Sequence, residues 1–273
     1  MAEPQDEIEV PLVGGNVAPV VRVGDTVRRI TGRWTPAVHA LLRHLDAVGF
    51  NAAPRVLGID DRGREVLSFI PGDAGIPTPD GDAAGSFPSG VFDDASLVAA
   101  AKLTRRYHDA VTSFVAPSDA RWRRQPGAPQ SGEIICHNDL ALHNTIYRAG
   151  LPVAFIDWDL AAPGSRLWDI AYALWRFVPL YNDADCETLR FACPDRPRRI
   201  ATFCSAYGLE DRTSVLDVVR QRQHVVYDTL RTWGEAGEPG FDRMWAEDHG
   251  NGPLRDIDYL DTHREHLDTF LEL

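Results

Sequence analysis

The chain has 273 residues, of which 44% are hydrophobic, so it can bury a sizeable core in one large domain or in two unequal lobes. Its 28 basic and 40 acidic residues give a formal net charge of −12. This balance argues against non-specific binding to nucleic acid or to anionic membranes, and it suits a cationic or neutral partner. Residues 1–10 lack the pattern of a secretory signal, and no later segment is long and apolar enough to span a membrane. We therefore expect a cytoplasmic protein.

The first part of the chain predicts a small β-rich lobe. Two runs of β-branched residues on either side of the turn pair Gly24-Asp25 predict a β-hairpin. An apolar stripe over residues 35–48 predicts a helix, and two short strands over residues 55–70 predict a second hairpin. We assign residues 1–72 to this N-terminal lobe.

The rest of the chain predicts a larger lobe that is mainly helical. Residues 73–93 are rich in Gly, Pro, Asp, Ala and Ser, which is typical of a linker or a long loop. Apolar residues then recur at helical spacing over residues 94–273, interrupted by a short strand at 134–135 and a hairpin over 145–156. The predicted fold class is therefore α+β, with two lobes.

Polar side chains gather on the loops between residues 134 and 159. Phosphoryl transfer needs an oxygen base for the acceptor hydroxyl and oxygen ligands for Mg²⁺. Asp139 can accept the hydroxyl proton, while Asn144 and Asp157 offer oxygens of the kind that Mg²⁺ prefers. Because Asp157 and Asp159 alternate along an extended segment, we expect their carboxylates to point to opposite sides.

The chain resembles the aminoglycoside phosphotransferase family, small-molecule kinases that share the protein-kinase fold. The matching motifs are His-Asn-Asp at 137–139 with Asn144, Ile-Asp-Trp-Asp at 156–159, Gly164, and Trp-Asp-Ile-Ala at 168–171. In the small lobe, residues 13–16 are similar to the family's phosphate loop and residues 67–72 to its hinge. The resemblance implies a bilobal protein-kinase-like fold and transfer of the γ-phosphate of ATP or GTP, with Mg²⁺, to a hydroxyl of a small molecule such as an aminoglycoside or another cationic antibiotic.

The same resemblance implies roles for individual residues. Asp139 would be the catalytic base, and Asn144 and Asp157 would be the magnesium ligands. The residues implied to bind nucleotide are Gly14, Gly15, Asn16, Arg29, Ser68, Phe69 and Ile70. The residues implied to support the site are His137, His143, Asp159, Asp169 and His39.

Two departures from the family pattern keep other functions open. No lysine precedes Lys102, so Arg29 or Arg28 stands where the family has a phosphate-pairing lysine, and the helix over 35–48 has no glutamate to pair with it, His39 being nearest. One alternative is a degenerate kinase fold that binds nucleotide or a ligand without turnover, as an immunity or sequestering protein. A lower alternative is a metal-dependent hydrolase that uses His137, Asp139, His143 and Asp157.

Overall fold

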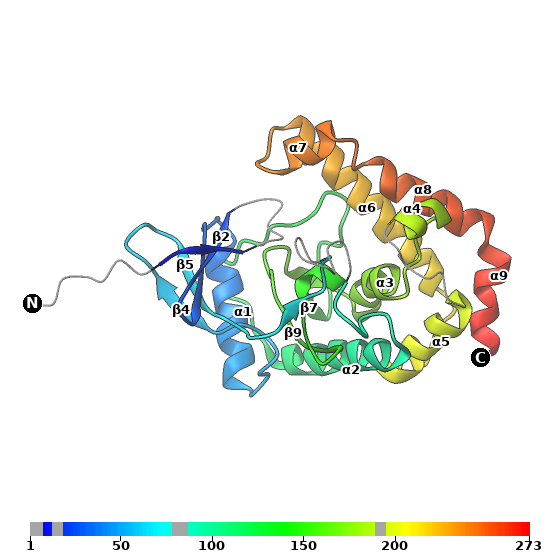
Figure 1. Cartoon of the computed structure of the whole chain (residues 1–273), viewed down its shortest axis with the longest axis horizontal. Helices are drawn as coiled ribbons and strands as arrows, with labels where there is room; N and C mark the ends of the chain where they lie inside the picture. The colour runs from blue at the N-terminus through cyan, green and yellow to red at the C-terminus, as the bar shows by residue number, and fades with distance from the viewer. Residues whose placement is uncertain (1–7, 13–18, 78–86, 189–194) are drawn as a thin grey trace, which may run out of the picture.

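The computed structural model of the protein describes residues 8–12, 19–77, 87–188 and 195–273. The chain forms a small lobe around a sheet at its N-terminal end and a larger lobe of helices at its C-terminal end (Figure 1). The predicted α+β class is therefore confirmed. In the described part of the chain, no helix combines the length and the apolar character needed to cross a membrane.

The small lobe contains a five-stranded antiparallel sheet with the strand order β1-β2-β3-β5-β4. Its strands are β1 (Val10–Pro11), β2 (Val20–Val23), β3 (Thr26–Arg29), β4 (Val56–Ile59) and β5 (Glu65–Ser68). Both predicted hairpins are confirmed. The β2–β3 turn places Gly24 at a φ of +57°, a backbone conformation that glycine adopts without steric cost.

Helix α1 (Thr35–Ala47) is the predicted helix of the small lobe. It begins with Pro36 in its first turn, where the missing N–H costs nothing. Val38, Leu41, Leu42 and Leu45 are all buried and join the main core. Because these residues share one face of the helix, α1 is fixed beside the sheet (Figure 1).

A second, three-stranded sheet lies where the lobes meet. Strand β6 (Asp73–Ala74), inside the predicted linker, pairs with β8 (Thr145–Arg148), which pairs with β9 (Leu151–Phe155). The predicted hairpin over 145–156 is thereby confirmed. Strand β7 (Ile134–Cys136) pairs with β10 (Ala162–Gly164), so the loops that follow β7 and β9 are held close together.

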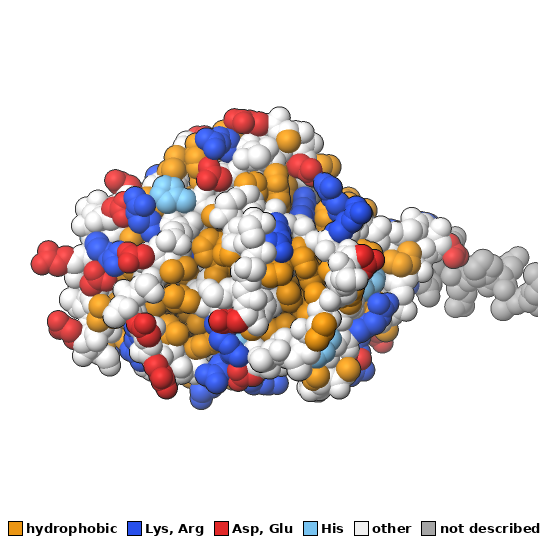
Figure 2. Space-filling view, turned by 180° about the vertical axis from the view of Figure 1, so that it is seen from behind, with side chains coloured by type: hydrophobic (Ala, Val, Ile, Leu, Met, Phe, Trp, Pro, Cys, Tyr) orange, Lys and Arg blue, Asp and Glu red, His pale blue; other side chains and the backbone are white. Residues whose placement is uncertain are grey.

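Helices make up most of the large lobe, as predicted. They are α2 (Asp94–Ala110), α3 (Arg166–Phe177), α4 (Asp183–Thr188), α5 (Arg196–Tyr207), α6 (Val215–Glu235), α7 (Phe241–Ala246), α8 (Asn251–Thr262) and α9 (Arg264–Asp268), with short 3₁₀ turns at Val111–Ser113, Leu142–Asn144 and Thr269–Glu272. Helix α3 is buried on nearly all sides and packs against α6. On the face seen in Figure 2, acidic and basic side chains are interspersed around apolar atoms, so the described residues there form no basic surface for nucleic acid.

Candidate active site

The Asp139 carboxylate is hydrogen-bonded through both of its oxygens. The Asn144 Nδ2 donates to Asp139 Oδ2 at 2.7 Å, and the Tyr172 hydroxyl donates to Asp139 Oδ1 at 2.6 Å. Asn144 is also tied to the backbone, because its Nδ2 donates to the Asp139 carbonyl at 3.1 Å. The loop after β7 and helix α3 thus fix the orientation of the predicted base.

Asn144 and Asp157 are brought together by the pairing of their chain segments. The Ile156 N–H donates to the Asn144 carbonyl at 2.9 Å, which places Asp157 next to Asn144. Since Asn144 Nδ2 is used by Asp139, the amide Oδ1 is the atom left for a cation. An amide oxygen and a carboxylate are hard ligands of the kind that Mg²⁺ takes, so the donor set fits that ion.

The prediction that Asp157 and Asp159 point to opposite sides is wrong. Arg29 Nη1 donates to Asp157 Oδ1 at 3.1 Å, and Arg29 Nη2 contacts Asp159 Oδ1. The alternation expected of an extended segment is broken at Asp157, whose φ of +60° lies in the left-handed region. Both carboxylates therefore face the same guanidinium.

Arg29 has a glutamate partner that comes from a strand and not from the helix. Arg29 Nε lies 2.8 Å from Glu65 Oε1, and His39 Nε2 lies 2.8 Å from Glu65 Oε2. Glu65 is directly opposite Arg29 in the β3–β5 pair, and opposite residues put their side chains on the same face of a sheet. Sequence reasoning missed Glu65. The pairing of these two strands was the signal that could have found it.

Three carboxylates share the Arg29 guanidinium, which leaves an excess of negative charge at this end of the cleft. Burial raises the pKa of Asp159 to about 6, and the charge of Arg29 only partly opposes this because Asp157 and Glu65 repel the ionised form. Burial would also raise the pKa of Asp157, but the charge and the hydrogen bond of Arg29 hold that pKa below its ordinary value. Asp157 is therefore ionised at neutral pH.

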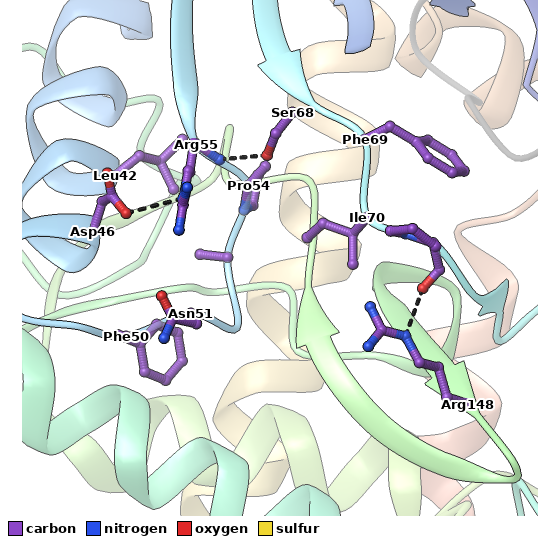
Figure 3. Close-up of a pocket in the computed structure, with 12 residues that line it drawn as sticks. Leu42, Asp46, Phe50, Asn51, Pro54, Arg55, Ser68, Phe69, Ile70 and Arg148 are labelled. Carbon is purple, nitrogen blue, oxygen red and sulfur yellow. Dashed lines mark hydrogen bonds and ion pairs between the residues drawn. The ribbon is translucent and has the colours of Figure 1, made fainter. Parts of the chain in front are cut away.

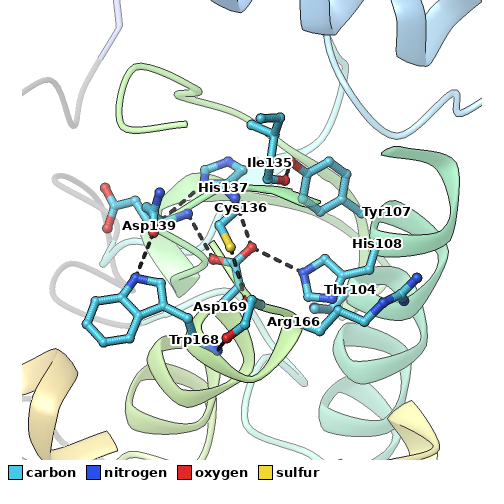
Figure 4. Close-up of polar contacts among 12 residues, drawn as sticks. Thr104, Tyr107, His108, Ile135, Cys136, His137, Asp139, Arg166, Trp168 and Asp169 are labelled. Atoms are coloured by element: carbon cyan, nitrogen blue, oxygen red, sulfur yellow. Dashed lines mark hydrogen bonds and ion pairs between the residues drawn. The ribbon is translucent and has the colours of Figure 1, made fainter. Parts of the chain in front are cut away.

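A buried carboxylate on α3 holds the loop that carries Asp139 (Figure 4). The backbone N–H groups of His137 and Asn138 each donate to Asp169 at 2.8 Å, and His108 Nε2 lies 3.2 Å from the same carboxylate. Burial would raise the pKa of Asp169, yet the hydrogen bond and charge of His108 hold it below its ordinary value. Asp169 thus positions the loop and does not face the cleft.

His137 is a structural residue of the same loop. Its Nδ1 accepts a hydrogen bond from the Asp139 N–H at 3.3 Å, so Nε2 carries the proton and donates to the Ile156 carbonyl at 3.1 Å. Burial lowers its pKa, which keeps the ring neutral. With both ring nitrogens engaged, His137 is a poor metal ligand. Within the described residues, no three His, Cys, Asp or Glu side chains cluster as a metal site.

Arg222 is a second residue that sequence reasoning missed. Its side chain is fully buried on α6, where Nη2 donates to the Asn138 carbonyl at 2.7 Å and Nη1 donates to Gln125 Oε1 at 3.0 Å. Arg222 therefore supports the Asp139 loop through a backbone carbonyl, whereas Asp169 supports it through backbone N–H groups. Its position three residues after Val219, in the apolar stripe of α6, was a sequence signal for a buried arginine.

The predicted hinge residues line a small pocket of about 180 Å³ (Figure 3). Ser68, Phe69 and Ile70 lie there beside Arg55, and the Ser68 N–H donates to the Arg55 carbonyl at 2.9 Å. The Phe69 ring lies under the Arg22 guanidinium at 3.8 Å. The three predicted phosphate-loop residues, Gly14, Gly15 and Asn16, lie outside the described residues.

Most of the other predicted site residues line a much larger cleft, of about 840 Å³. It is lined by Arg29, Asp139, His143, Asn144, Asp157 and Asp159. His143 is exposed in this cleft, whereas His39 and Asp169 are buried behind its wall. The proposed base, the proposed metal ligands and Arg29 of β3 therefore all line the same cleft.

Comparison with known proteins identifies the class of protein that this fold and site define. A model of the phosphotransferase enzyme family matches residues 75–214, and the chain belongs to that family. It is 37% identical over 208 residues to the trifolitoxin immunity protein of Rhizobium leguminosarum bv. trifolii, covering 74% of each chain.

Solved structures of small-molecule kinases share the fold, which confirms the predicted kinase-like architecture. An aminoglycoside phosphotransferase of Streptomyces rimosus, in complex with ADP and streptomycin, superposes with a TM-score of 0.55 at 15% identity over 83% of this chain and 94% of that one. A choline/ethanolamine kinase family protein of Mesorhizobium loti superposes with a TM-score of 0.54 at 18% identity, over 98% of this chain and 89% of that one. At these identities the likeness concerns the fold alone.

Proposed function

We propose that this protein transfers the γ-phosphoryl group of ATP or GTP to a hydroxyl group of a small molecule. The observation that carries the proposal is the Asp139 carboxylate, oriented by Asn144 and Tyr172 at the wall of an 840 Å³ cleft. A carboxylate held in this way can take the proton of an acceptor hydroxyl as that hydroxyl attacks phosphorus. Membership of the phosphotransferase enzyme family supports the same chemistry.

In this proposal, Tyr172 orients the base and does not compete with it for the proton. Burial raises the pKa of Tyr172 above its ordinary value, so the hydroxyl stays protonated and keeps donating to Asp139. Asn144 donates from the other side. The free lone pairs of the Asp139 carboxylate are then directed at the cleft, where an acceptor hydroxyl would bind.

The donor nucleotide would lie between the lobes. Arg29 is the proposed partner of its phosphates, with Gly14, Gly15 and Asn16 in the phosphate loop and the backbone of residues 68–70 against the base. Asn144 and Asp157 are the proposed ligands of Mg²⁺, which when bound neutralises the charge that develops on the transferring phosphoryl group. We also propose the division of the chain that the sequence indicates, with an N-terminal lobe of residues 1–72, a linker of residues 73–93 and a C-terminal lobe of residues 94–273.

The acceptor class proposed from the sequence is an aminoglycoside or another cationic antibiotic. The structural neighbour from Streptomyces rimosus binds streptomycin, and this supports a hydroxyl-rich acceptor of that size here. Glu238 and Glu247 line the cleft, where they can receive ammonium groups.

The test is an acceptor screen with a base-deficient variant. Nucleoside diphosphate release is measured with ATP or GTP and Mg²⁺ across antibiotics, sugars and amino alcohols, after a thermal-shift screen has selected the ligands that raise the melting temperature. Asp139→Ala should lose about 100-fold or more in turnover while its fold and nucleotide binding persist. Asp185→Asn, which changes another carboxylate of the cleft, is the matched control. Full activity of Asp139→Ala would contradict the proposal.

A second candidate is an immunity function without turnover. The 37% identity to a trifolitoxin immunity protein favours it, as does the engagement of Arg29 by three carboxylates of its own chain. A sensitive bacterial strain that produces this protein would be challenged with trifolitoxin. Equal protection by the wild type and by Asp139→Ala would support binding alone, whereas loss of protection in the variant would tie immunity to phosphoryl transfer.

A further inference from the structure

Four arginines line the large cleft, and one of them differs from the others. Arg29 is paired with three carboxylates, Arg123 lies 3.9 Å from Glu238, and Arg255 lies 2.9 Å from Asp185. Arg176 on α3 has no carboxylate within ion-pair distance among the residues that the structure describes. A guanidinium without a counter-charge in a cleft wall is costly, because a partly desolvated charge needs a partner.

The surroundings of Arg176 hold its side chain in place without satisfying its charge. Its guanidinium lies 3.7 Å from the centre of the Trp175 ring and 5.0 Å from that of Tyr172. Nη1 donates to the Tyr181 hydroxyl at 3.3 Å, and the buried Nε has no hydrogen-bond partner within the described part of the chain. Ring faces attract a cation but do not replace acceptors for its N–H groups.

The nearby carboxylate of Asp256 is already engaged in hydrogen bonds. Asp256 accepts hydrogen bonds from the Trp175 Nε1 at 2.9 Å and from the backbone N–H of Asn182 at 2.8 Å. Burial holds the pKa of Asp256 above its ordinary value, and these hydrogen bonds and the charge of Arg176 only partly oppose it. Asp256 thus makes its hydrogen bonds with other groups, and the Arg176 guanidinium keeps N–H groups that have no carboxylate acceptor among the described residues.

Arg176 is also next to the proposed base. Tyr172 and Arg176 are four residues apart on α3, so their side chains share one face of that helix. The Tyr172 hydroxyl contacts Asp139 at 2.6 Å, and its ring contacts the Arg176 guanidinium. A small acceptor can thus reach both Asp139 and Arg176 at the same time.

We propose that Arg176 is the anion subsite of the acceptor: the hydroxyl to be phosphorylated lies at Asp139, and an oxyanion of the same molecule, a carboxylate or a phosphate ester, binds Arg176. The fork of a guanidinium matches the two oxygens of either group. This inference rests on the proposed function for the role of Asp139. It adds that the acceptor is a hydroxylated anion, or carries an anionic group beside any cationic ones.

The experiment compares anionic and neutral probes of the same shape at constant ionic strength, by calorimetric titration in the absence of nucleotide. One pair is 3-hydroxybutyrate and 3-hydroxybutyramide, and the other is glycerol 3-phosphate and glycerol. We expect the anionic member of at least one pair to bind about tenfold more tightly or better, which is the effect of one charge-assisted pair. The pair that shows the preference distinguishes a carboxylate from a phosphate ester.

Two variants of Arg176 and one control make the result specific. Arg176→Gln should abolish the preference for the anion, and Arg176→Lys, which keeps the charge, should retain part of it. Arg255→Gln removes an arginine of the same cleft that is paired with Asp185, and it should leave the preference unchanged. Equal or undetectable binding of both members in the wild type, or an unchanged preference in Arg176→Gln, would overturn the inference.

The binding readout separates this inference from the proposed function. A protein that prefers the anionic probes but transfers phosphate to no hydroxyl would overturn the transfer reaction and leave the anion subsite standing. A protein that transfers phosphate equally well to the neutral and the anionic member of each pair would overturn the subsite alone.

Discussion

At the scale of single residues, Arg29 decides the electrostatics of the cleft. Its three guanidinium nitrogens contact Glu65, Asp157 and Asp159 separately, an arrangement that the single nitrogen of a lysine cannot reproduce. The pairing with a glutamate that the family pattern places on a helix is here made with a strand residue. Because more carboxylates than cations meet at this point, one of the carboxyl groups holds a proton more readily than the others.

The pH dependence of stability should reveal that carboxyl group. The pKa of Asp159 is raised to about 6 from its ordinary value of 3.8, so the folded state binds this proton more tightly than the unfolded state does. The contribution to stability is fully present below pH 3.8 and is lost as the pH rises through 6. Relative to Asp159→Asn, the wild type should lose about 2–3 kcal/mol of unfolding free energy between pH 4 and pH 7, measured by urea denaturation.

Asp157→Asn serves as the comparison, because the pKa of Asp157 is shifted in the opposite direction to that of Asp159. The pKa of Asp157 is lowered, so its contribution is present above its ordinary pKa and is lost as the pH falls. The difference between wild type and Asp157→Asn should therefore grow with rising pH. If the difference in unfolding free energy from wild type changed with pH in the same direction in both variants, the opposite pKa shifts of Asp157 and Asp159 would be contradicted.

At the scale of elements, helix α3 connects the two halves of the site. One of its residues, Asp169, holds the backbone of the loop after β7, and another, Tyr172, holds the side chain of Asp139 on that loop. Both hairpins and helix α1 were predicted correctly, since each depends on local turns and apolar periodicity. The turn at Asp157 was not predicted, because a positive φ at a non-glycine residue has no local sequence signal.

Removing the negative charge of Asp169 should destabilise the loop. Asp169→Asn replaces an oxygen that accepts backbone N–H bonds with a donor, and we expect a loss of about 2–4 kcal/mol at pH 7. Since the pKa of Asp169 is lowered, the difference from wild type should shrink below pH 4. Chemical denaturation at several pH values measures both effects.

Asp109→Asn is the control for that experiment. Asp109 lies in α2 and pairs with Arg105 and Arg166 in a half-exposed position, so its loss should cost less than about 1 kcal/mol. A cost for Asp169→Asn as small as that of the control would show that the loop does not depend on the buried carboxylate.

At the scale of the whole molecule, Arg123 joins the two lobes. Its guanidinium lies 4.4 Å from the ring of Trp34 in the small lobe, and 5.0 and 5.2 Å from the rings of Trp233 and Phe241 in the large lobe. Because one cation contacts aromatic rings of both lobes across the cleft, it restrains their relative motion.

Arg123→Gln should loosen this contact. We expect a loss of about 1–2 kcal/mol in unfolding free energy and faster hydrogen exchange around Trp34, while the exchange of α3 stays unchanged. Arg231→Gln is the matched control, since Arg231 lies over the single ring of Tyr227 at 5.6 Å within α6 and connects no lobes. Unchanged exchange at Trp34 in Arg123→Gln would contradict the role of Arg123.

The sequence by itself determined the family and the two-lobed architecture, and it pointed to the candidate site residues in the loops between 134 and 171. These motifs are short and contiguous, and the roles that we propose for them follow from residue type. Only the tertiary structure decided that Glu65 pairs with Arg29, that Arg222 donates to the backbone of the Asp139 loop, and that Arg176 makes no ion pair with a carboxylate in the described part of the chain. Each of these contacts depends on strand register or on the packing of distant helices, and the charge balance of a cleft is a sum over side chains that no single stretch of sequence contains.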